Sequence, residues 1–262
     1  MQERHKNRKK YFEEQEYTTQ KYVIPFIQPF LKISDQISVL EIGCGEGGNL
    51  KPFLDLGCKC TGIDLNANQI ENAKIYYQEH PHLTKLDLIS EDIYKMEHLD
   101  DQFDLIMLRD VIEHIPNQER FMNFVKKFLK KNGVLFFGFP PWYNPFGGHQ
   151  QVLTGVASKI PYYHILPKPI YLGVLNLFGF KKNDISELLE IHDTGISIER
   201  FERILRKENY TILSKTDFLF NPNYEVKFGL KPKKVKSPFN KIPFFRNFYT
   251  TAVYYVIMKN EK

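Results

Sequence analysis

Apolar and polar positions follow two alternating patterns along the first half of the chain. Short apolar runs that favour strands lie at 37–43, 60–65, 86–90, 103–108 and 133–139. The stretches between them, including 66–79 and 117–131, have helical character. Strands separated by helices form βαβ crossovers, which predict an α/β fold: a mostly parallel sheet with helices on both faces.

We expect one domain at 35–262, preceded by an N-terminal helical segment at 1–34. The regular pattern is interrupted by a Pro- and Tyr-rich region at about 140–195, which we interpret as an inserted lid that covers the substrate. A second interruption, a basic loop, is expected at about 221–247.

Regular structure returns near residue 197. The pattern predicts a helix at 197–208, with Ser197 as its N-cap and Arg200 where a capping box would have an acidic residue. Two further strands are expected at 210–219 and 249–258.

Composition excludes some partners and leaves others open. The 262 residues include 36 basic and 31 acidic side chains, and a net charge of +5 is too small to favour nucleic acid. Basic runs at 3–10 and 231–241 fit solvated segments, with attraction to an anionic substrate or a membrane surface as the alternative. Prolines and charges break the apolar stretch at 160–180, so it predicts a substrate-covering or interfacial segment and no membrane span.

The three cysteines argue against a disulfide framework. They are odd in number and clustered at 44, 58 and 60, and no hydrophobic leader precedes them, so a cytoplasmic location is expected. No second pair at ligand spacing follows Cys58 and Cys60, which favours strand packing over metal binding.

The run VLEIGCGEGGNL at 39–50 is the most informative stretch. Gly43, Gly45 and Gly48 fit the dinucleotide fingerprint, and glycines after a strand allow a backbone to approach a ligand closely. A tight structural turn is the alternative. Glu41 stands two positions before the first glycine, where a carboxylate would repel the pyrophosphate of a dinucleotide.

Two more acidic residues stand at the ends of the next two predicted strands. Asp64 lies 21 residues beyond Gly43, a position from which a carboxylate can accept both ribose hydroxyls of an adenosine. Asp92 can accept a hydrogen bond from an adenine amino group, with Ile93 against the ring. Each alone fits a strand-end or turn residue, but three acids at three strand ends favour an adenosine site.

These residues resemble the class I S-adenosylmethionine-dependent methyltransferases over roughly 35–140. Glu41 to Gly47 matches the first family motif, an acid, an apolar residue and G-x-G-x-G, while Asp64 and Asp92 match the ribose and adenine acids. The resemblance implies a Rossmann-like seven-stranded sheet whose last strand is antiparallel, and S-adenosyl-L-methionine as cofactor. It implies these cofactor-binding residues: Glu41, Gly43, Cys44, Gly45, Gly47, Asp64, Leu65, Asp92, Ile93 and Arg109.

The run LRDVIEHIPN after the fourth predicted strand is similar to a stretch in quinone-ring O-methyltransferases of the type 11/12 group. There it borders the methionine half of the cofactor and the acceptor, and Asp110, Glu113 and His114 should share one side of a helical turn. Three interpretations stay open: a structural helix cap, a general base in His114 or Glu113, and metal ligation. Small-RNA methyltransferases use a related metal-binding stretch with a later histidine; the H-x-x-H pair is absent here, so no metal ligand is assigned, and His149 could complete such a site only by its own approach.

The run FPPWYNPFGGHQ follows the fifth predicted strand. Its aromatic residues Trp142, Tyr143 and Phe146 could line an acceptor pocket, with a packed irregular loop as the alternative. His149 is a second candidate base.

We therefore predict a cytoplasmic methyltransferase that uses S-adenosyl-L-methionine and acts on a small molecule. The expected acceptor group is a hydroxyl of an amphiphilic or lipid-linked compound, with His114, Glu113 and His149 as catalytic candidates. Peripheral membrane contact stays open, nucleic acid is disfavoured, and the oligomeric state is not assigned. The alternatives are a nucleotide-dependent oxidoreductase, a non-catalytic regulatory protein, and a metal-assisted RNA 2′-O-methyltransferase.

Overall fold

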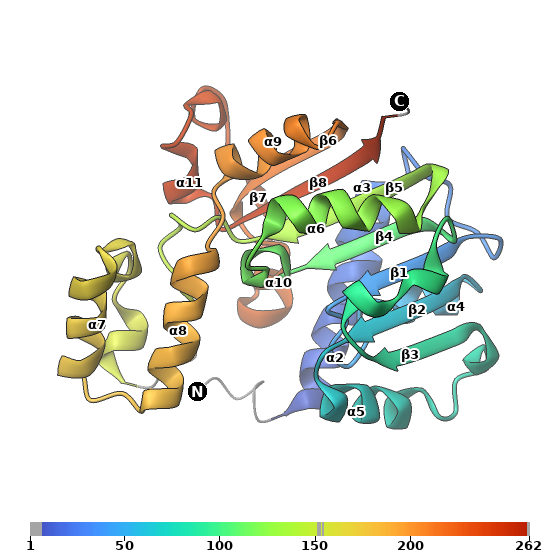
Figure 1. The fold of residues 1–262 in the computed structure, drawn as a ribbon, viewed down its shortest axis with the longest axis horizontal. Helices are drawn as coiled ribbons and strands as arrows, with labels where there is room; N and C mark the ends of the chain where they lie inside the picture. Colours follow the sequence, from blue (N-terminus) through green and yellow to red (C-terminus); the bar gives the residue numbers. More distant parts are fainter. Residues whose placement is uncertain (1–6, 151–152, 154, 261–262) are drawn as a thin grey trace.

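The computed structural model describes residues 7–150, 153 and 155–260, and it is built on one mixed sheet (Figure 1). Residues 1–6, which include part of the predicted N-terminal segment and basic run, lie outside the described residues. The strand order is β3-β2-β1-β4-β5-β8-β6-β7. The strands are β1 Ser38–Ile42, β2 Lys59–Asp64, β3 Leu86–Ser90, β4 Phe103–Arg109, β5 Leu129–Phe139, β6 Tyr210–Phe220, β7 Lys233–Lys234 and β8 Ala252–Lys259.

Strands β1 to β6 run in one direction, and β8 and the short β7 run in the opposite direction. β1 pairs in parallel with β2 and β4, and β8 is antiparallel to both β5 and β6. The predicted Rossmann-like sheet with an antiparallel last strand is confirmed. The sheet has eight strands rather than seven, because the two-residue β7 adds to β6 at the edge.

Helices cover both faces of the sheet (Figure 1). They are α2 Arg8–Thr18, α3 Ile24–Ile27, α4 Lys51–Asp55, α5 Ala67–Tyr77, α6 Gln118–Val125, α7 Lys168–Leu177, α8 Lys182–Thr194, α9 Ile198–Lys207, α10 Asn223–Phe228 and α11 Arg246–Tyr249, with a π-helical turn at Thr19–Val23. The core has two layers: α6 and α9 pack on one face, and the N-terminal segment, α4 and α5 pack on the other.

Local sequence signals explain where α9 begins and why one helix boundary was predicted wrongly. Ser197 caps α9 as predicted, because its Oγ accepts a hydrogen bond from the Arg200 N–H at 3.1 Å. The predicted helical stretch 117–131 is wrong beyond residue 128, where β5 begins. Cys58 and Cys60 are buried in the core cluster on one face of the sheet, as the packing interpretation expects.

The region after β5 forms a separate lobe. Helices α7 and α8 pack on each other around a small apolar cluster that includes Tyr171, Leu175 and Leu188. Figure 1 shows this lobe beside the sheet. Among the described residues, no helix is both long enough and apolar enough to cross a membrane.

Candidate cofactor and acceptor site

The glycine loop connects β1 to α4 and requires glycine at specific positions. Gly43 has φ of +69°, and a Cβ there would lie 2.5 Å from a methyl carbon of Val111. A Cβ on Gly48 would lie 2.4 Å from the carbonyl oxygen of Phe12 in α2. The loop is therefore held between the segment after β4 and the N-terminal helix.

Asp64 ends β2 and its carboxylate supports the loop directly. One oxygen accepts a hydrogen bond from the Gly45 N–H and the other accepts from the Asn66 N–H, each at 2.8 Å. Each oxygen keeps a further lone pair, so the carboxylate can still accept ribose hydroxyls. Leu65, next to it, is 77% exposed and can contact a bound ligand.

Asp92 caps the 3₁₀ turn Ile93–Lys95 that follows β3. Its Oδ1 accepts a hydrogen bond from the Tyr94 N–H at 3.0 Å. Ile93 packs in the core and leaves little of its side chain for an adenine ring.

Glu41 lies in β1 and is almost fully buried. Asn49 donates a hydrogen bond to its Oε1 at 2.6 Å, while its Oε2 has no partner in the described part of the chain. Burial raises the pKa of Glu41 to about 8. A buried carboxylate oxygen without a partner fits a ligand cation such as the ammonium group of S-adenosyl-L-methionine. Neighbouring Cys44 is also buried, and burial raises the pKa of its thiol, so it packs rather than reacts.

Arg109 ends β4 and points toward the N-terminal segment. Its guanidinium donates hydrogen bonds to Asn49 Oδ1 at 2.6 Å, to Thr19 Oγ at 3.4 Å, and to Asn223 in α10. Asn49 therefore links Arg109 to Glu41. The guanidinium N–H groups of Arg109 donate to side chains of the protein.

An ion pair that the sequence did not predict joins the N-terminal segment to the glycine loop. Arg8 in α2 forms an ion pair with Glu46 of the glycine loop, and Glu46 is completely buried. Thr19 also donates a hydrogen bond to Asn49 at 2.8 Å. Only the acidic residue within the glycine run could have signalled this pair.

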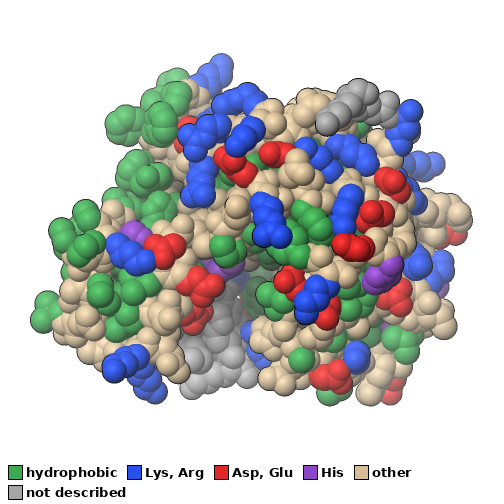
Figure 2. Space-filling view, viewed as in Figure 1, with side chains coloured by type: hydrophobic (Ala, Val, Ile, Leu, Met, Phe, Trp, Pro, Cys, Tyr) green, Lys and Arg blue, Asp and Glu red, His purple; other side chains and the backbone are tan. Residues whose placement is uncertain are grey.

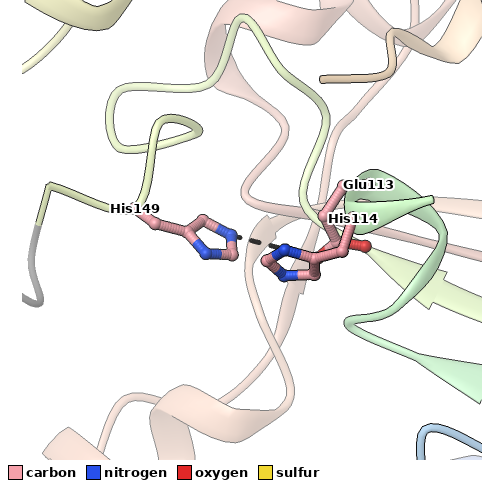
Figure 3. Close-up of side chains that lie close together, drawn as sticks. All are labelled: Glu113, His114 and His149. Atoms are coloured by element: carbon pink, nitrogen blue, oxygen red, sulfur yellow. Dashed lines mark ion pairs between the residues drawn. The ribbon is translucent and has the colours of Figure 1, made fainter. Parts of the chain in front are cut away.

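Glu113, His114 and His149, from the segments after β4 and β5, come together as Figure 3 shows. Their ligand atoms all lie within 4.8 Å of one another, and the His149 Nε2 lies 4.0 Å from Glu113 Oε1. Glu113 and His114 belong to the 3₁₀ turn Ile112–His114. The expected Asp110 precedes this turn with φ of +56° and is not part of the group.

The electrostatics of this group follow from its surroundings. Burial, reinforced by the negative charge of Asp110, raises the pKa of Glu113 well above its usual range. The imidazole of His114 has an exposed edge, yet the protein atoms crowded around it lower its pKa. A neutral His114 therefore offers a nitrogen lone pair at neutral pH.

Trp142 and Tyr143, two of the aromatic residues after β5, pack against neighbouring rings. Trp142 contacts the rings of His164 and His192 edge-on, with centroids 4.8 and 5.3 Å away. Tyr143 stacks on Phe248. Both therefore join the loop to neighbouring elements, which matches the packed-loop alternative more closely than an acceptor wall.

The sheet order, the glycine loop and the acids at three strand ends define the class I methyltransferase fold. A family model described as a methyltransferase domain matches residues 13–147. The chain belongs to this family, its cofactor is S-adenosyl-L-methionine, and the resemblance seen in the sequence is confirmed.

Several relatives are ubiquinone biosynthesis O-methyltransferases. The enzyme from Rickettsia typhi is 29% identical over 232 residues, which cover 85% of this chain and 85% of the relative. The enzyme from Pelagibacter ubique is 32% identical over 100 residues, 38% of this chain and only 40% of the relative. A sterol 24-C-methyltransferase from Gibberella zeae is 30% identical over 111 residues, 42% of this chain and 29% of the relative.

Solved structures agree on the fold. A geranyl diphosphate C-methyltransferase from Streptomyces coelicolor, solved with S-adenosyl-L-homocysteine, aligns with a TM-score of 0.58 and 13% identity over 91% of this chain and 80% of that one. A methyltransferase from Clostridium acetobutylicum aligns with a TM-score of 0.57 and 14% identity, covering 94% and 92%.

Proposed function

We propose that this methyltransferase methylates a hydroxyl group of a small amphiphilic molecule. The observation that carries the proposal is the contact between Val111 and Gly43, which brings the turn bearing Glu113 and His114 next to the cofactor loop. An acceptor bound at these side chains would therefore lie beside the cofactor.

The chemistry needs alignment and proton removal. S-adenosyl-L-methionine supplies a sulfonium methyl group, which bonds to the acceptor oxygen while the broken C–S electron pair stays on sulfur and leaves S-adenosyl-L-homocysteine. Glu41, Asp64 and the glycine loop orient the donor, and alignment of two reactants lowers the barrier substantially. The acceptor hydroxyl, held at the group formed by Glu113, His114 and His149, must lose its proton as its oxygen attacks the methyl carbon.

Two observations support an amphiphilic acceptor. The relatives and structural neighbours carry names that refer to ubiquinone, sterols and geranyl diphosphate, all with extended apolar parts. The segment between β7 and α11 also exposes Phe239, Ile242, Phe244 and Phe245 beside several lysines. We propose that this segment contacts an anionic membrane surface, where such acceptors partition. The matched relatives do not favour an oxidoreductase.

The first test is calorimetric titration of S-adenosyl-L-homocysteine into the wild-type protein, Asp64→Ala and Asp87→Ala. Asp87 is an exposed residue of β3 and serves as the matched control. We expect one-site binding by the wild type and by Asp87→Ala, and at least about tenfold weaker binding by Asp64→Ala, because a charge-assisted ribose contact contributes roughly 1.5 kcal/mol or more.

The second test measures methyl transfer from labelled cofactor to a panel of phenols, hydroxylated quinols, amines and structured RNA. Preferential transfer to hydroxylated compounds with an apolar tail supports the proposal. Efficient methylation of RNA, without saturable use of hydroxylated small molecules, would overturn it.

A further inference from the structure

Glu113 has a buried carboxyl group without the partners that burial normally requires. Its side chain is 3% exposed, and neither carboxylate oxygen has a hydrogen-bond partner among the described residues. A buried polar group left unpaired costs about 1 to 3 kcal/mol, and more when it is charged. A catalytic role or a bound ion or water that provides the missing interactions can explain such a group.

Two imidazoles lie at the same place and come from separate segments. His114 is the neighbour of Glu113 on the turn after β4, and His149 comes from the loop after β5. The two rings meet edge-on with centroids 4.9 Å apart (Figure 3). Two nitrogen donors and one carboxylate form a ligand set that suits zinc and other divalent transition metals.

The surrounding chain holds these side chains in position. Gln118 donates hydrogen bonds to the carbonyl oxygens of Ile112 and Thr194, at 3.2 and 2.5 Å, and so fixes the turn that carries Glu113 and His114. The residue before His149 is Gly148, where a Cβ would lie 2.3 Å from the Cβ of His164. His149 itself has φ of +57°, a conformation that few residues other than glycine adopt.

We propose that Glu113, His114 and His149 bind one divalent transition-metal ion, and that the ion receives the acceptor hydroxyl. Ligand bonds of about 2.0 to 2.2 Å place neighbouring ligand atoms roughly 3.0 to 3.6 Å apart. The observed separations, all within 4.8 Å, therefore need only small side-chain rotations to close around an ion. Three protein ligands leave positions open for oxygen ligands from water or substrate. The role toward the acceptor rests on the proposed function, whereas ion binding does not.

A metal ion held by these three side chains would activate the acceptor oxygen by coordinating it. A divalent ion lowers the pKa of a coordinated hydroxyl, so its proton is released to water near neutral pH. The oxygen then carries the electron pair that forms the new bond to the methyl carbon. The three side chains act as ligands in this arrangement and need not accept the proton themselves.

The test is a titration of chelator-treated protein with cobalt(II) chloride, followed by visible absorption, with zinc chloride competition. The wild type should bind one cobalt(II) ion per chain and develop the absorption bands of a four- or five-coordinate site, which zinc abolishes. Glu113→Gln and His149→Gln should each weaken binding at least about tenfold. His98→Gln, which changes an exposed histidine outside the group, is the matched control and should bind as the wild type does.

Calorimetry with S-adenosyl-L-homocysteine separates the possible failures. A variant that still binds this ligand is folded, so its loss of cobalt can be attributed to the missing side chain. Wild-type protein that binds S-adenosyl-L-homocysteine but shows no saturable cobalt binding would refute the metal site and leave the proposed function standing. Cobalt binding that survives in both variants would place the ion elsewhere and would equally refute it.

Discussion

At the scale of single residues, Glu41 links the cofactor loop to the N-terminal segment. Its carboxyl group is buried and accepts one hydrogen bond from Asn49, which in turn accepts from Thr19 and Arg109. Burial raises the pKa of Glu41 to about 8. The free protein therefore contains a mostly neutral carboxyl group at neutral pH, ready to lose its proton when a ligand cation arrives.

This pKa predicts a specific dependence of stability on pH. An exposed glutamate titrates near 4.5, so between that pH and about 8 the folded chain keeps a proton that the unfolded chain has lost. The stability that this group contributes is complete below about pH 4.5 and is lost as pH rises through about 8. The linked slope is about 1.4 kcal/mol per pH unit. We expect Glu41→Gln, which stays neutral, to gain stability relative to the wild type across this window.

The measurement is urea unfolding of ligand-free wild type, Glu41→Gln and the exposed control Glu97→Gln at pH 5, 6, 7 and 8. The free energy of unfolding of Glu41→Gln minus that of the wild type should rise steadily with pH, while Glu97→Gln follows the wild type. A difference that stays constant with pH would show that Glu41 titrates normally in the folded protein.

The sequence predicted where the acidic candidates lie relative to the strands, because that signal is local. Glu41, Asp64 and Asp92 could be placed because each follows from its position relative to one strand. The contacts of Arg8 with Glu46 and of Arg109 with Asn49 could not, because they join positions far apart in the chain. His149 was a candidate from its loop alone, but its approach to Glu113 depends on how two loops pack.

At the scale of elements, α2 acts as a clamp on the glycine loop. The carbonyl of Phe12 lies against Gly48, and Arg8 reaches the buried carboxylate of Glu46. The helix itself has little amphipathic character, so its position depends on these specific contacts as well as on the burial of Phe12. Loss of the ion pair should therefore affect both stability and the cofactor loop.

We expect Arg8→Met to lower the free energy of unfolding by about 2 kcal/mol, because it leaves the Glu46 charge buried and unpaired. This loss of stability is smaller than the cost of breaking a fully buried ion pair, because the Arg8 side chain is partly exposed. The double variant Arg8→Met/Glu46→Met should recover most of the loss, since no unpaired charge remains. Urea unfolding of the two single variants and the double variant measures the coupling. Additive losses would mean that the ion pair contributes nothing.

The limits of prediction at this scale also have physical causes. Near-continuous apolar runs predicted the central strands, because strands buried on both faces admit few polar residues. The polar start of β5, Lys130 to Asn132, reads as the continuation of a helix and hid the strand boundary. The two lysines of β7 carry no strand pattern, and their pairing with β6 is set by the fold.

At the scale of the whole molecule, apolar and basic side chains gather at one end of the sheet. β3 and β7 are its two edge strands, and the segment after β7 exposes Phe244 and Phe245 to 63% and 65%. Lysines 231, 233, 234, 236 and 241 in the same region are also exposed. Figure 2 shows hydrophobic side chains at this end with basic side chains beside them. Basic and aromatic side chains on one face fit the interface of an anionic bilayer.

We expect the protein to sediment with vesicles that contain phosphatidylglycerol and to remain free with vesicles of phosphatidylcholine alone. Phe244→Ser/Phe245→Ser should reduce partitioning at least about tenfold, because two aromatic rings lose their apolar contact. Replacing Lys231, Lys233, Lys234 and Lys236 with Gln should reduce it further, since each lysine contributes about 1 kcal/mol near such a surface. Half-molar salt should weaken binding for the same electrostatic reason.

Leu83→Ser is the control: it removes an exposed apolar side chain just before the opposite edge strand and should leave vesicle binding unchanged. Equal loss in Leu83→Ser, or equal binding to neutral vesicles, would mean that this end of the sheet does not form the membrane contact.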